Sequence, residues 1–184
     1  TLGDNVENLT LTGTTAINGG MLILAKTGVN AIGGNLTIGN AGVGLDYLQL
    51  GASDQIVDTS VATFNGSGSN AGIFQLNNQN ETLAGIVSAG GAGIVENGNA
   101  SAGTSILTVS VPTNTSHTFS GVLQDNGGSG SGILALTKAG AGTLILTGTG
   151  TYTGVTTVNT GTLRIGTVTA LYNGVAANWT PANI

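Results

Sequence analysis

The stretch Thr137–Gly166 decides the fold, and it reads TKAGAGTLILTGTGTYTGVTTVNTGTLRIG. It contains three short runs, Leu144–Leu146, Thr156–Val158 and Leu163–Ile165, which are separated by segments that contain glycine. An apolar pattern with a period of two predicts a β-strand that buries one face, and glycine between such runs marks tight turns. The stretch therefore predicts short strands joined by corners.

The same alternation recurs along the whole chain. Each run predicts a strand with an aliphatic inner side and Thr, Ser or Gln on the outer side, where β-branched threonine suits the extended backbone. No segment shows a helical period, so an all-β chain is expected. The alternating apolar positions are Leu9 and Leu11, Leu22 and Leu24, Leu36 and Ile38, Leu48 and Leu50, Phe74 and Leu76, Leu107, Val109 and Val111, Leu134 and Leu136, Leu144 and Leu146, and Leu163 and Ile165.

The composition excludes several classes of protein. Of 184 residues 33 are glycine, 40% are hydrophobic and only 6% are charged. Disorder requires low hydrophobicity and high net charge, and a collagen helix requires a strict Gly-X-Y period with many prolines, whereas this chain has two. Glu, Lys and Arg, which favour helices, are scarce, so a helical bundle is not expected.

An internal repeat links the two ends of the chain. Residues 13–24, GTTAINGGMLIL, align without gaps on residues 154–165, GVTTVNTGTLRI. The matched apolar positions fall on the inward phase, while variable pairs such as Ile23 with Arg164 fall on the outward phase. We therefore expect residues 1–184 to be one solenoid segment with a long repeat.

Two architectures fit strands punctuated by Gly and Asn. Asn-Gly at 18–19, 65–66, 97–98, 126–127 and 173–174 is a hairpin signal, which would suit an antiparallel sandwich or barrel. The alternative is a right-handed, single-stranded parallel β-helix, and we favour it because the strands are short, the residues are small and uncharged, and aromatic residues number only seven. At about 22 residues per coil the chain would form roughly eight coils, about 40 Å long.

Residues 137–166 resemble the autotransporter-associated β-strand repeat, also called the passenger-associated transport repeat. Gly150 departs from the family pattern, which often has asparagine there. "GGNLTIGN" at 33–40 and the run 118–144 resemble other stretches of such proteins. The positions that match the family pattern are Lys138, Gly140, Gly142, Leu144, Leu146, Gly148, Tyr152, Thr153, Gly154, Thr156, Val158, Gly161 and Leu163.

The resemblance implies a parallel β-helical passenger that is exported and displayed at the bacterial surface, so an extracellular or cell-surface location is expected. It implies a role in passenger secretion and folding and supplies no catalytic residues. The chain has no cysteine, which agrees with passage through a narrow pore. No signal peptide is evident at the start, and the uncharged run 139–163 is too polar to span a membrane.

No catalytic, cofactor-binding or metal-ligating residue is predicted. His117, the sole histidine, lacks a nucleophile motif nearby and is expected at the surface of a coil. Asp46, Asp54 and Asp58 form the only acid-rich stretch, which leaves a weak calcium site or a polysaccharide-cleaving carboxylate pair as alternatives. The three basic residues, Lys26, Lys138 and Arg164, are far from these acids in sequence, and they are too few for nucleic-acid binding.

Two further patterns are weaker. The glycine-rich runs AGAGTL and GGSGSG are expected to be coil corners, because no Lys-Ser or Lys-Thr and helix follow them. Seven N-x-S/T sequons start at Asn8, Asn35, Asn65, Asn80, Asn99, Asn114 and Asn178. In a chain so rich in Asn, Ser and Thr, composition alone makes several of them expected, and glycosylation is the alternative interpretation.

The expected function is structural: a stalk, spacer or adhesive fibre unit of a secreted or surface-displayed protein. No amphipathic cap is evident at either end, so we expect continuation into further repeats or end-to-end stacking. A carbohydrate-binding adhesin that contacts surface glycans is the alternative, and a polysaccharide hydrolase or lyase is a third. As a test of the core, Leu146→Asp is predicted to be severely destabilising and Ile145→Thr mild.

Overall fold

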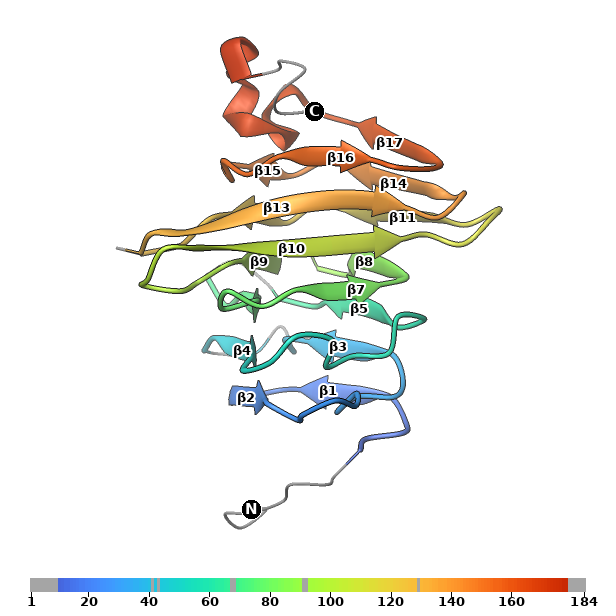
Figure 1. Ribbon diagram of the computed structural model, residues 1–184, viewed down its shortest axis with the longest axis vertical. Coiled ribbons are helices and arrows are strands. Elements are labelled where there is room, and N and C mark those ends of the chain that lie inside the picture. The colour runs from blue at the N-terminus through green and yellow to red at the C-terminus, as the bar shows by residue number, and fades with distance from the viewer. Residues whose placement is uncertain are drawn as a thin grey trace.

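The computed structural model shows short strands stacked along one axis, with the N-terminal coil at one end and the C-terminal coil at the other (Figure 1). It describes residues 10–40, 42, 44–66, 69–90, 93–128 and 130–178. In these residues every strand pairing is parallel, and the chain forms a β-solenoid of about five turns. The antiparallel sandwich or barrel is therefore wrong.

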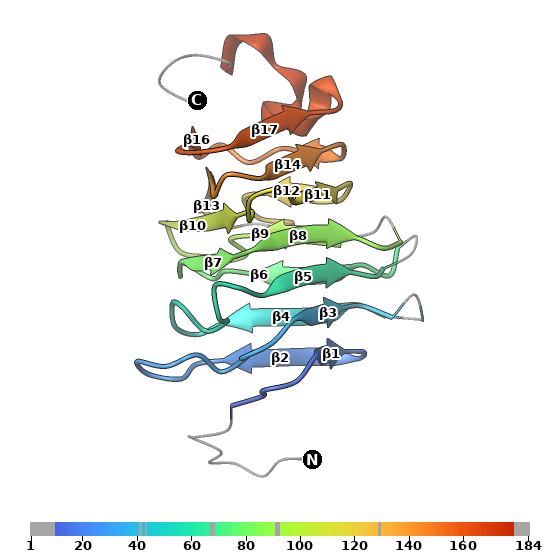
Figure 2. The same ribbon diagram turned by 90° about the vertical axis from the view of Figure 1, so that its right-hand side faces the viewer.

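The strands form three faces. The first face holds two sheets, β1-β3-β5-β8 and β11-β14-β17, and β8 contacts β11 (Figure 2). The second face is the sheet β2-β4-β6-β9-β12-β15, and the third is β7-β10-β13-β16, which continues toward the N-terminus as single bridges between Leu11, Ile32 and Ile56. The bounds are β1 Thr15–Ile17, β2 Gly20–Leu24, β3 Leu36–Ile38, β4 Asp46–Leu50, β5 Val61–Phe64, β6 Gly72–Gln75, β7 Glu81–Leu83, β8 Gly85–Ser88, β9 Gly93–Glu96, β10 Gly103–Ser110, β11 Ser116–Phe119, β12 Val122–Gln124, β13 Gly132–Ala139, β14 Thr143–Leu146, β15 Thr149–Gly150, β16 Thr156–Val158 and β17 Thr162–Ile165.

The strand register gives the length of each coil. Gly20, Asp46, Gly72 and Gly93 lie over one another on the second face, which makes successive coils of 26, 26 and 21 residues. On the third face Leu107 pairs with Leu136, a coil of 29 residues. The prediction of roughly eight coils is not confirmed. It assumed about 22 residues per coil, whereas three of these four coils contain 26 to 29 residues, because their corners are longer.

The core is built from inward columns of aliphatic and aromatic side chains. On the second face Leu22, Leu48, Phe74, Val95 and Leu123 lie in register, and all but Leu22 are buried. Leu144 and Leu146 are buried while Ile145 points outward and is half-buried, as the alternation predicts. The second face has two outward columns. One differs from the prediction, because it consists of Met21, Tyr47, Ile73, Ile94 and Val122. The other contains Gln49, Gln75 and Gln124, as the alternation predicts.

Asn-Gly pairs lie at corners of the solenoid instead of hairpins. Asn18-Gly19 joins β1 to β2, and Asn97-Gly98 follows β9. Asn97 is fully buried, and its Nδ2 donates to Asn78 Oδ1 at 2.9 Å and to the Ile133 carbonyl at 2.9 Å. An Asn-Gly pair thus provides both the sharp turn and hydrogen bonds between coils, which is why it does not distinguish a hairpin from a solenoid corner.

The two aligned repeat segments fold alike. Each is a strand, a corner and a strand, β1 to β2 and β16 to β17. The matched glycines Gly20 and Gly161 have φ of 75° and 73°, a conformation that glycine adopts without the steric cost of a Cβ. The segments lie on different faces, so the repeat specifies a corner and not a place on a particular sheet.

Three 3₁₀ turns cover part of the last coil: η1 (Val168–Ala170), η2 (Tyr172–Gly174) and η3 (Ala176–Asn178). Ala170, Leu171 and Tyr172 are buried against the core, so this end carries a cap that the sequence pattern did not indicate. Asp4, Glu7, Leu9 and Trp179 lie outside the described residues. The described part of the chain contains no helix with the length and hydropathy of a membrane span.

Candidate functional site

The corner between β13 and β14 is organised by Lys138. This residue occupies an inward position of β13, in register with Val109 on one side and Val158 on the other, and its side chain is fully buried. Its Nζ donates to the carbonyls of Ala139, Gly140 and Thr160, the last two at 2.7 and 3.2 Å. All three ammonium donors therefore have a partner, although burial still lowers the pKa of Lys138. We call these groups the lysine clamp.

Glycines leave room for the clamp and for the next coil. Gly161 has a positive φ, and a Cβ there would meet Lys138 Nζ at 2.8 Å. A Cβ at Gly142 would collide with the carbonyl of Pro112, and one at Gly148 with that of Gly121. These positions need glycine because the backbones of consecutive coils approach each other too closely for a side chain.

A second set of contacts, the tyrosine cluster, ties the last coil together. It comprises Tyr152, Thr156 and Tyr172. The Tyr152 hydroxyl lies 2.7 Å from Thr156 Oγ1, and the rings of Tyr152 and Tyr172 are 5.4 Å apart. The Thr156 N–H donates to the Tyr172 hydroxyl at 3.0 Å, and that hydroxyl donates to the Gly154 carbonyl at 3.3 Å. Burial raises the pKa of Tyr152, so its hydroxyl stays protonated.

Asp125 joins two coils through a third contact. Its Oδ2 accepts hydrogen bonds from Thr153 N–H at 3.1 Å and Thr153 Oγ1 at 2.8 Å, and its Oδ1 accepts one from Leu134 N–H at 2.8 Å. Thr153 belongs to the coil that follows Asp125, 28 residues along the chain. The carboxylate is thus occupied by donors from its own coil and the next.

Two buried carboxylates were missed by the sequence analysis. Glu81 accepts backbone N–H bonds from Gln55 and Ile56 at Oε2 and from Thr82 at Oε1. Burial, with a smaller contribution from the charge of Asp54, raises the pKa of Glu81 to about 7. Glu81 belongs to no recognisable motif. The only signal in the sequence was its position two residues before Leu83, which places both side chains on the inward side of β7.

Glu96 belongs to an amide ladder on the second face. Gln49, Gln75, Glu96 and Gln124 lie in register on β4, β6, β9 and β12. Gln49 donates to Gln75 at 3.0 Å, Gln75 donates to Glu96 Oε1 at 2.8 Å, and Gln124 donates to Glu96 Oε2 at 2.6 Å. The sequence shows Gln at similar positions in several predicted strands. Those positions can be recognised as a ladder only when the register between the strands is known.

The acid-rich stretch does not form a site. Asp46 is buried at the start of β4, while Asp54 and Asp58 are exposed in the corner segment that follows it. Among the described residues, no group of three or more His, Cys, Asp and Glu side chains comes together to hold a metal ion. Asp54 instead lies near enough to Glu81 to affect its pKa.

His117 takes an inward position on β11, contrary to the surface position that was expected. It lies in register with Leu144, and it covers Gly85, where a Cβ would collide with the imidazole ring. The ring is half-buried, and desolvation lowers the pKa of His117. Its place is that of a core side chain.

The other basic residues and the sequons are also located. Lys26 Nζ donates to Thr10 Oγ1 at 2.7 Å, and Arg164 points outward from β17. Asn35 and Asn80 accept backbone N–H bonds from the next coil, whereas Asn114 is exposed in a turn with φ of 58°. Sequons at Asn8, Asn65 and Asn178 extend outside the described residues.

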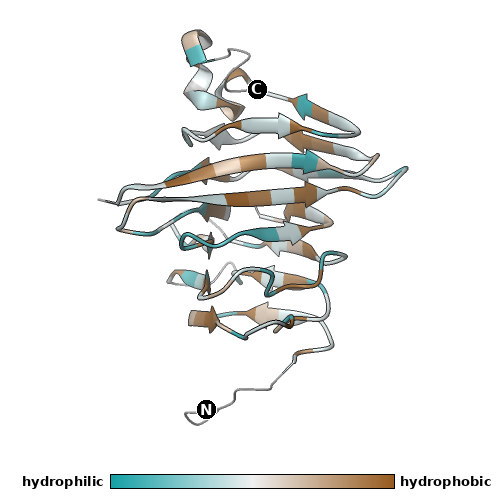
Figure 3. Cartoon of the chain, in the orientation of Figure 1, coloured by the Kyte–Doolittle hydropathy of each residue, from teal (hydrophilic) through white to brown (hydrophobic). Residues whose placement is uncertain are grey.

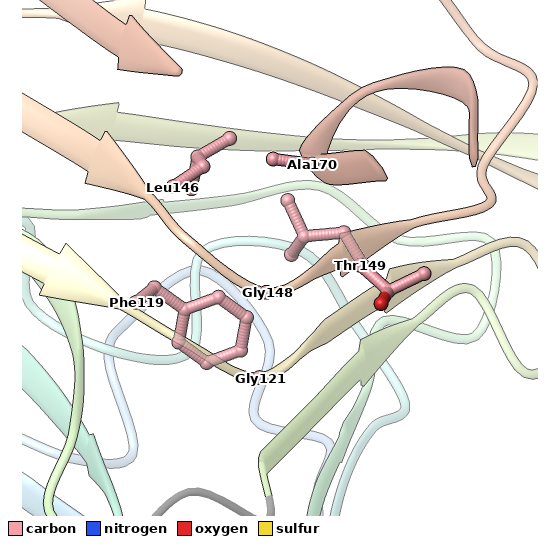
Figure 4. A pocket seen from close by; sticks show the side chains of 7 residues that line it. Phe119, Gly121, Leu146, Gly148, Thr149 and Ala170 are labelled. Atoms are coloured by element: carbon pink, nitrogen blue, oxygen red, sulfur yellow. The ribbon is translucent and has the colours of Figure 1, made fainter. Parts of the chain in front are cut away.

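A small apolar gap lies below η1 (Figure 4). The space between its lining atoms totals about 130 Å³, part of which is open to solvent, and it has no room for a water molecule. Phe119 and Leu146 line it from consecutive coils and Ala170 lines it from η1. The gap is therefore too small to be a ligand pocket.

Residues 136–165 match the family model of the passenger-associated-transport-repeat. No curated protein and no solved structure is significantly similar to the chain. The matched residues contain the lysine clamp, the close-approach glycines and all of the tyrosine cluster except Tyr172. The chain therefore carries a passenger-associated transport repeat at residues 136–165, within a parallel β-solenoid.

Proposed function

We propose that the chain is a non-enzymatic structural segment, a stalk or spacer, of a secreted or surface-displayed bacterial protein. The observation that carries this proposal is that polar groups of the matched repeat bind one coil to the next, either to each other or to the coil that precedes the repeat. Lys138 bonds the Thr160 carbonyl 22 residues later, and Asp125 bonds Thr153 28 residues later. A solenoid held by such neighbour contacts is an extended, stiff element.

The proposed location is outside the cell or at its surface. What supports it is the match of residues 136–165 to the passenger-associated transport repeat, since passenger repeats are associated with export. We also take the winding to be right-handed, because crossover connections between parallel strands almost always are. In this proposal the contacts of the repeat at 136–165 hold the adjacent coils in register.

Surface display tests the proposal directly. The chain is fused between a secretion signal and a translocator barrel, and exposure is measured as sensitivity to protease added to intact cells. We expect wild type to be displayed in a folded, protease-resistant form, and Lys138→Met to be displayed at a lower level or degraded. Lys26→Met, which loses only an exposed bond to Thr10, is the matched control. Retention of wild type inside the cell would contradict the proposal.

Adhesion is a separate proposal that rests on the same fold. A carbohydrate-binding adhesin would bind on a glycan array and lose binding when one outward patch is changed.

A further inference from the structure

The Asn-Gly pairs of the chain, at 18–19, 65–66, 97–98, 126–127 and 173–174, differ in how firmly the solenoid holds them. An asparagine followed by glycine can lose its side-chain amide without an enzyme, because the glycine nitrogen can attack the side-chain carbonyl carbon. The attack requires that the glycine N–H gives up its proton and that the side chain turns toward it. Hydrogen bonds and burial oppose both steps, so a pair that is held reacts only when the chain opens locally.

Three of the pairs are held through the glycine N–H, which donates to an oxygen atom and so keeps its proton. Two of them are also held through the asparagine. Asn97 Nδ2 is buried and donates to the Ile133 carbonyl at 2.9 Å, and Asn126 Nδ2 donates to the Asn99 carbonyl at 3.1 Å. The glycine bonds run from Gly98 to the Asp125 carbonyl at 3.1 Å, from Gly127 to Glu96 Oε2 at 2.9 Å and from Gly174 to the Leu171 carbonyl at 3.0 Å.

A fourth pair, Asn65-Gly66, is held by packing. Gly66 is buried and Asn65 is half-buried. The backbone of Gly39 lies against them, because a Cβ on Gly39 would be 3.1 Å from the Asn65 carbonyl carbon and 3.2 Å from the Gly66 nitrogen. Solvent base therefore reaches the Gly66 N–H less readily than it would reach an exposed one.

The fifth pair, Asn18-Gly19, is open. Asn18, Gly19 and Gly20 are all exposed, and a Cβ at either glycine would meet no atom within 4 Å. Within the part of the chain that the structure describes, neither the Asn18 side chain nor the Gly19 N–H has a hydrogen-bond partner. Only the main-chain carbonyl of Asn18 is bonded, by Asn40 Nδ2 at 2.6 Å. The side chain can therefore turn toward the Gly19 nitrogen without breaking a contact.

We propose that Asn18-Gly19 is a site of spontaneous deamidation and the Asn-Gly pair of this solenoid that reacts first. The Gly19 nitrogen gives its proton to solvent base and forms a bond to Asn18 Cγ. The bond from Cγ to Nδ2 then breaks, ammonia leaves, and a cyclic succinimide remains. Water opens this ring at either of its two carbonyl carbons: cleavage at Cγ gives aspartate, and cleavage at the main-chain carbonyl carbon gives isoaspartate. The net reaction consumes water and releases ammonia.

The isoaspartate product alters the corner between β1 and β2. Figure 3 shows β2 as a hydrophobic strand at the N-terminal end of the stack. Both strands have a fixed register with the next coil, in which Ile17 pairs with Ile38 and Gly20 pairs with Asp46. In isoaspartate the main chain runs through Cβ and Cγ of residue 18, so the link between these two registers becomes one methylene group longer. The former Asn18 carbonyl, to which Asn40 donates, becomes part of a carboxylate on a side branch.

The experiment compares the folded chain with the same chain unfolded in urea. Both are kept at neutral pH, and conversion of each asparagine is followed by peptide mass spectrometry. In the folded chain we expect Asn18 to convert about tenfold or more faster than Asn97 and Asn126, which react only through local opening. In urea these pairs should convert at similar rates, because the contacts that separate them are lost. Part of the Asn18 product should be isoaspartate, which chromatography separates from the aspartate form.

Gly19→Ala is the matched variant. It places a methyl group beside the attacking nitrogen, whereas the added Cβ meets no other part of the fold. We expect conversion of Asn18 to slow to the level of Asn97 and Asn126. The proposal is overturned if Asn18 in the folded chain reacts no faster than those two residues or more slowly than Asn65. It is also overturned if Gly19→Ala leaves the conversion of Asn18 unchanged, since the loss of the amide would then not proceed through the Gly19 nitrogen.

Discussion

At the scale of single residues, buried polar groups connect the coils. Lys138, Glu81 and Asn97 are each at most 1% exposed, and each bonds to groups in a neighbouring coil or corner. A parallel solenoid leaves corner carbonyls and amides without strand partners, and such groups are costly to bury unless they are hydrogen-bonded. Lys138, Glu81 and Asn97 each form hydrogen bonds with such groups.

Removal of the lysine clamp should be costly. Lys138→Met keeps the aliphatic stem but removes the ammonium that donates to the carbonyls of Ala139, Gly140 and Thr160, of which the Ala139 carbonyl keeps the N–H of Val111 as a donor. We expect the free energy of unfolding in urea to fall by about 2–4 kcal/mol. Lys26→Met should change it by less than about 0.5 kcal/mol. Equal losses in the two variants would show that Lys138 does not stabilise the corner.

Two residues should give opposite pH dependence of stability. The folded-state pKa of His117 is lowered below 6.5, so its contribution is present above pH 6.5 and is lost as the pH falls and the unfolded chain takes up the proton. The pKa of Glu81 is raised from 4.5 to about 7, so its contribution is present below pH 4.5 and is lost as the pH rises through 7. For Glu81 the change is on the order of 3 kcal/mol.

Urea unfolding at several pH values separates the two. His117→Leu places an aliphatic residue in register with Leu144 and should remove the loss of stability below pH 6.5, while the decline toward pH 7 persists. Glu81→Gln should remove that decline, but at a lower stability throughout, because its amide nitrogen cannot accept a backbone N–H bond. A pH profile that is unchanged in both variants would contradict these assignments.

At the scale of elements, strands and corners differ in how well the sequence predicts them. The period-two alternation correctly placed strands at Leu36–Ile38, Leu144–Leu146 and Leu163–Ile165, because burial of one side leaves a local trace in the sequence. The relative direction of paired strands was harder to predict, because an Asn-Gly pair is compatible with an antiparallel hairpin and with a solenoid corner. Parallel pairing joins residues 19 to 29 positions apart, and the alternation within one strand carries no information about it.

The alternation of the core has a direct test. Leu144 and Leu146 point inward on β14 and are at most 2% exposed, whereas Ile145, which lies between them, points outward. Leu146→Asp buries an unpaired charge and should lower the free energy of unfolding by more than about 4 kcal/mol. Ile145→Thr should cost less than about 1 kcal/mol, and equal costs at the two positions would contradict the assigned faces.

Corner glycines can be tested with a matched pair. At Gly148 an added Cβ would collide with the carbonyl oxygen of Gly121 in the preceding coil, whereas at Gly19 it would meet nothing within 4 Å. Gly148→Ala should lower the free energy of unfolding by more than about 2 kcal/mol, as expected for strain in a packed region. Gly19→Ala should be neutral or slightly stabilising, because it reduces the entropy of the unfolded chain. Thermal unfolding of both variants measures the difference.

At the scale of the whole molecule, the number of coils and the capped end were the features that sequence reasoning missed. Coil length varies because corners have different lengths, as the 26- and 21-residue steps on the second face show, and alternation within strands contains no information on corner length. The cap depends on Tyr172, which has φ of 49°. A bulky residue rarely adopts this conformation, and only the contacts of the folded cap favour it.

The cap should control which part of the solenoid opens first. In a linear stack each coil is stabilised by its neighbours, so a terminal coil that loses contacts opens without the rest. Tyr172→Phe keeps the ring against Tyr152 but removes the hydroxyl that accepts the Thr156 N–H. We expect the protection of the Thr156 amide against hydrogen exchange to fall by about tenfold, equivalent to about 1.4 kcal/mol, while amides of the central strand β10 keep theirs. Tyr47 points outward on the second face, so Tyr47→Phe should change the protection of neither the Thr156 amide nor the β10 amides. A uniform loss of protection in Tyr172→Phe would mean that the solenoid unfolds as one cooperative unit and that the cap stabilises all of it.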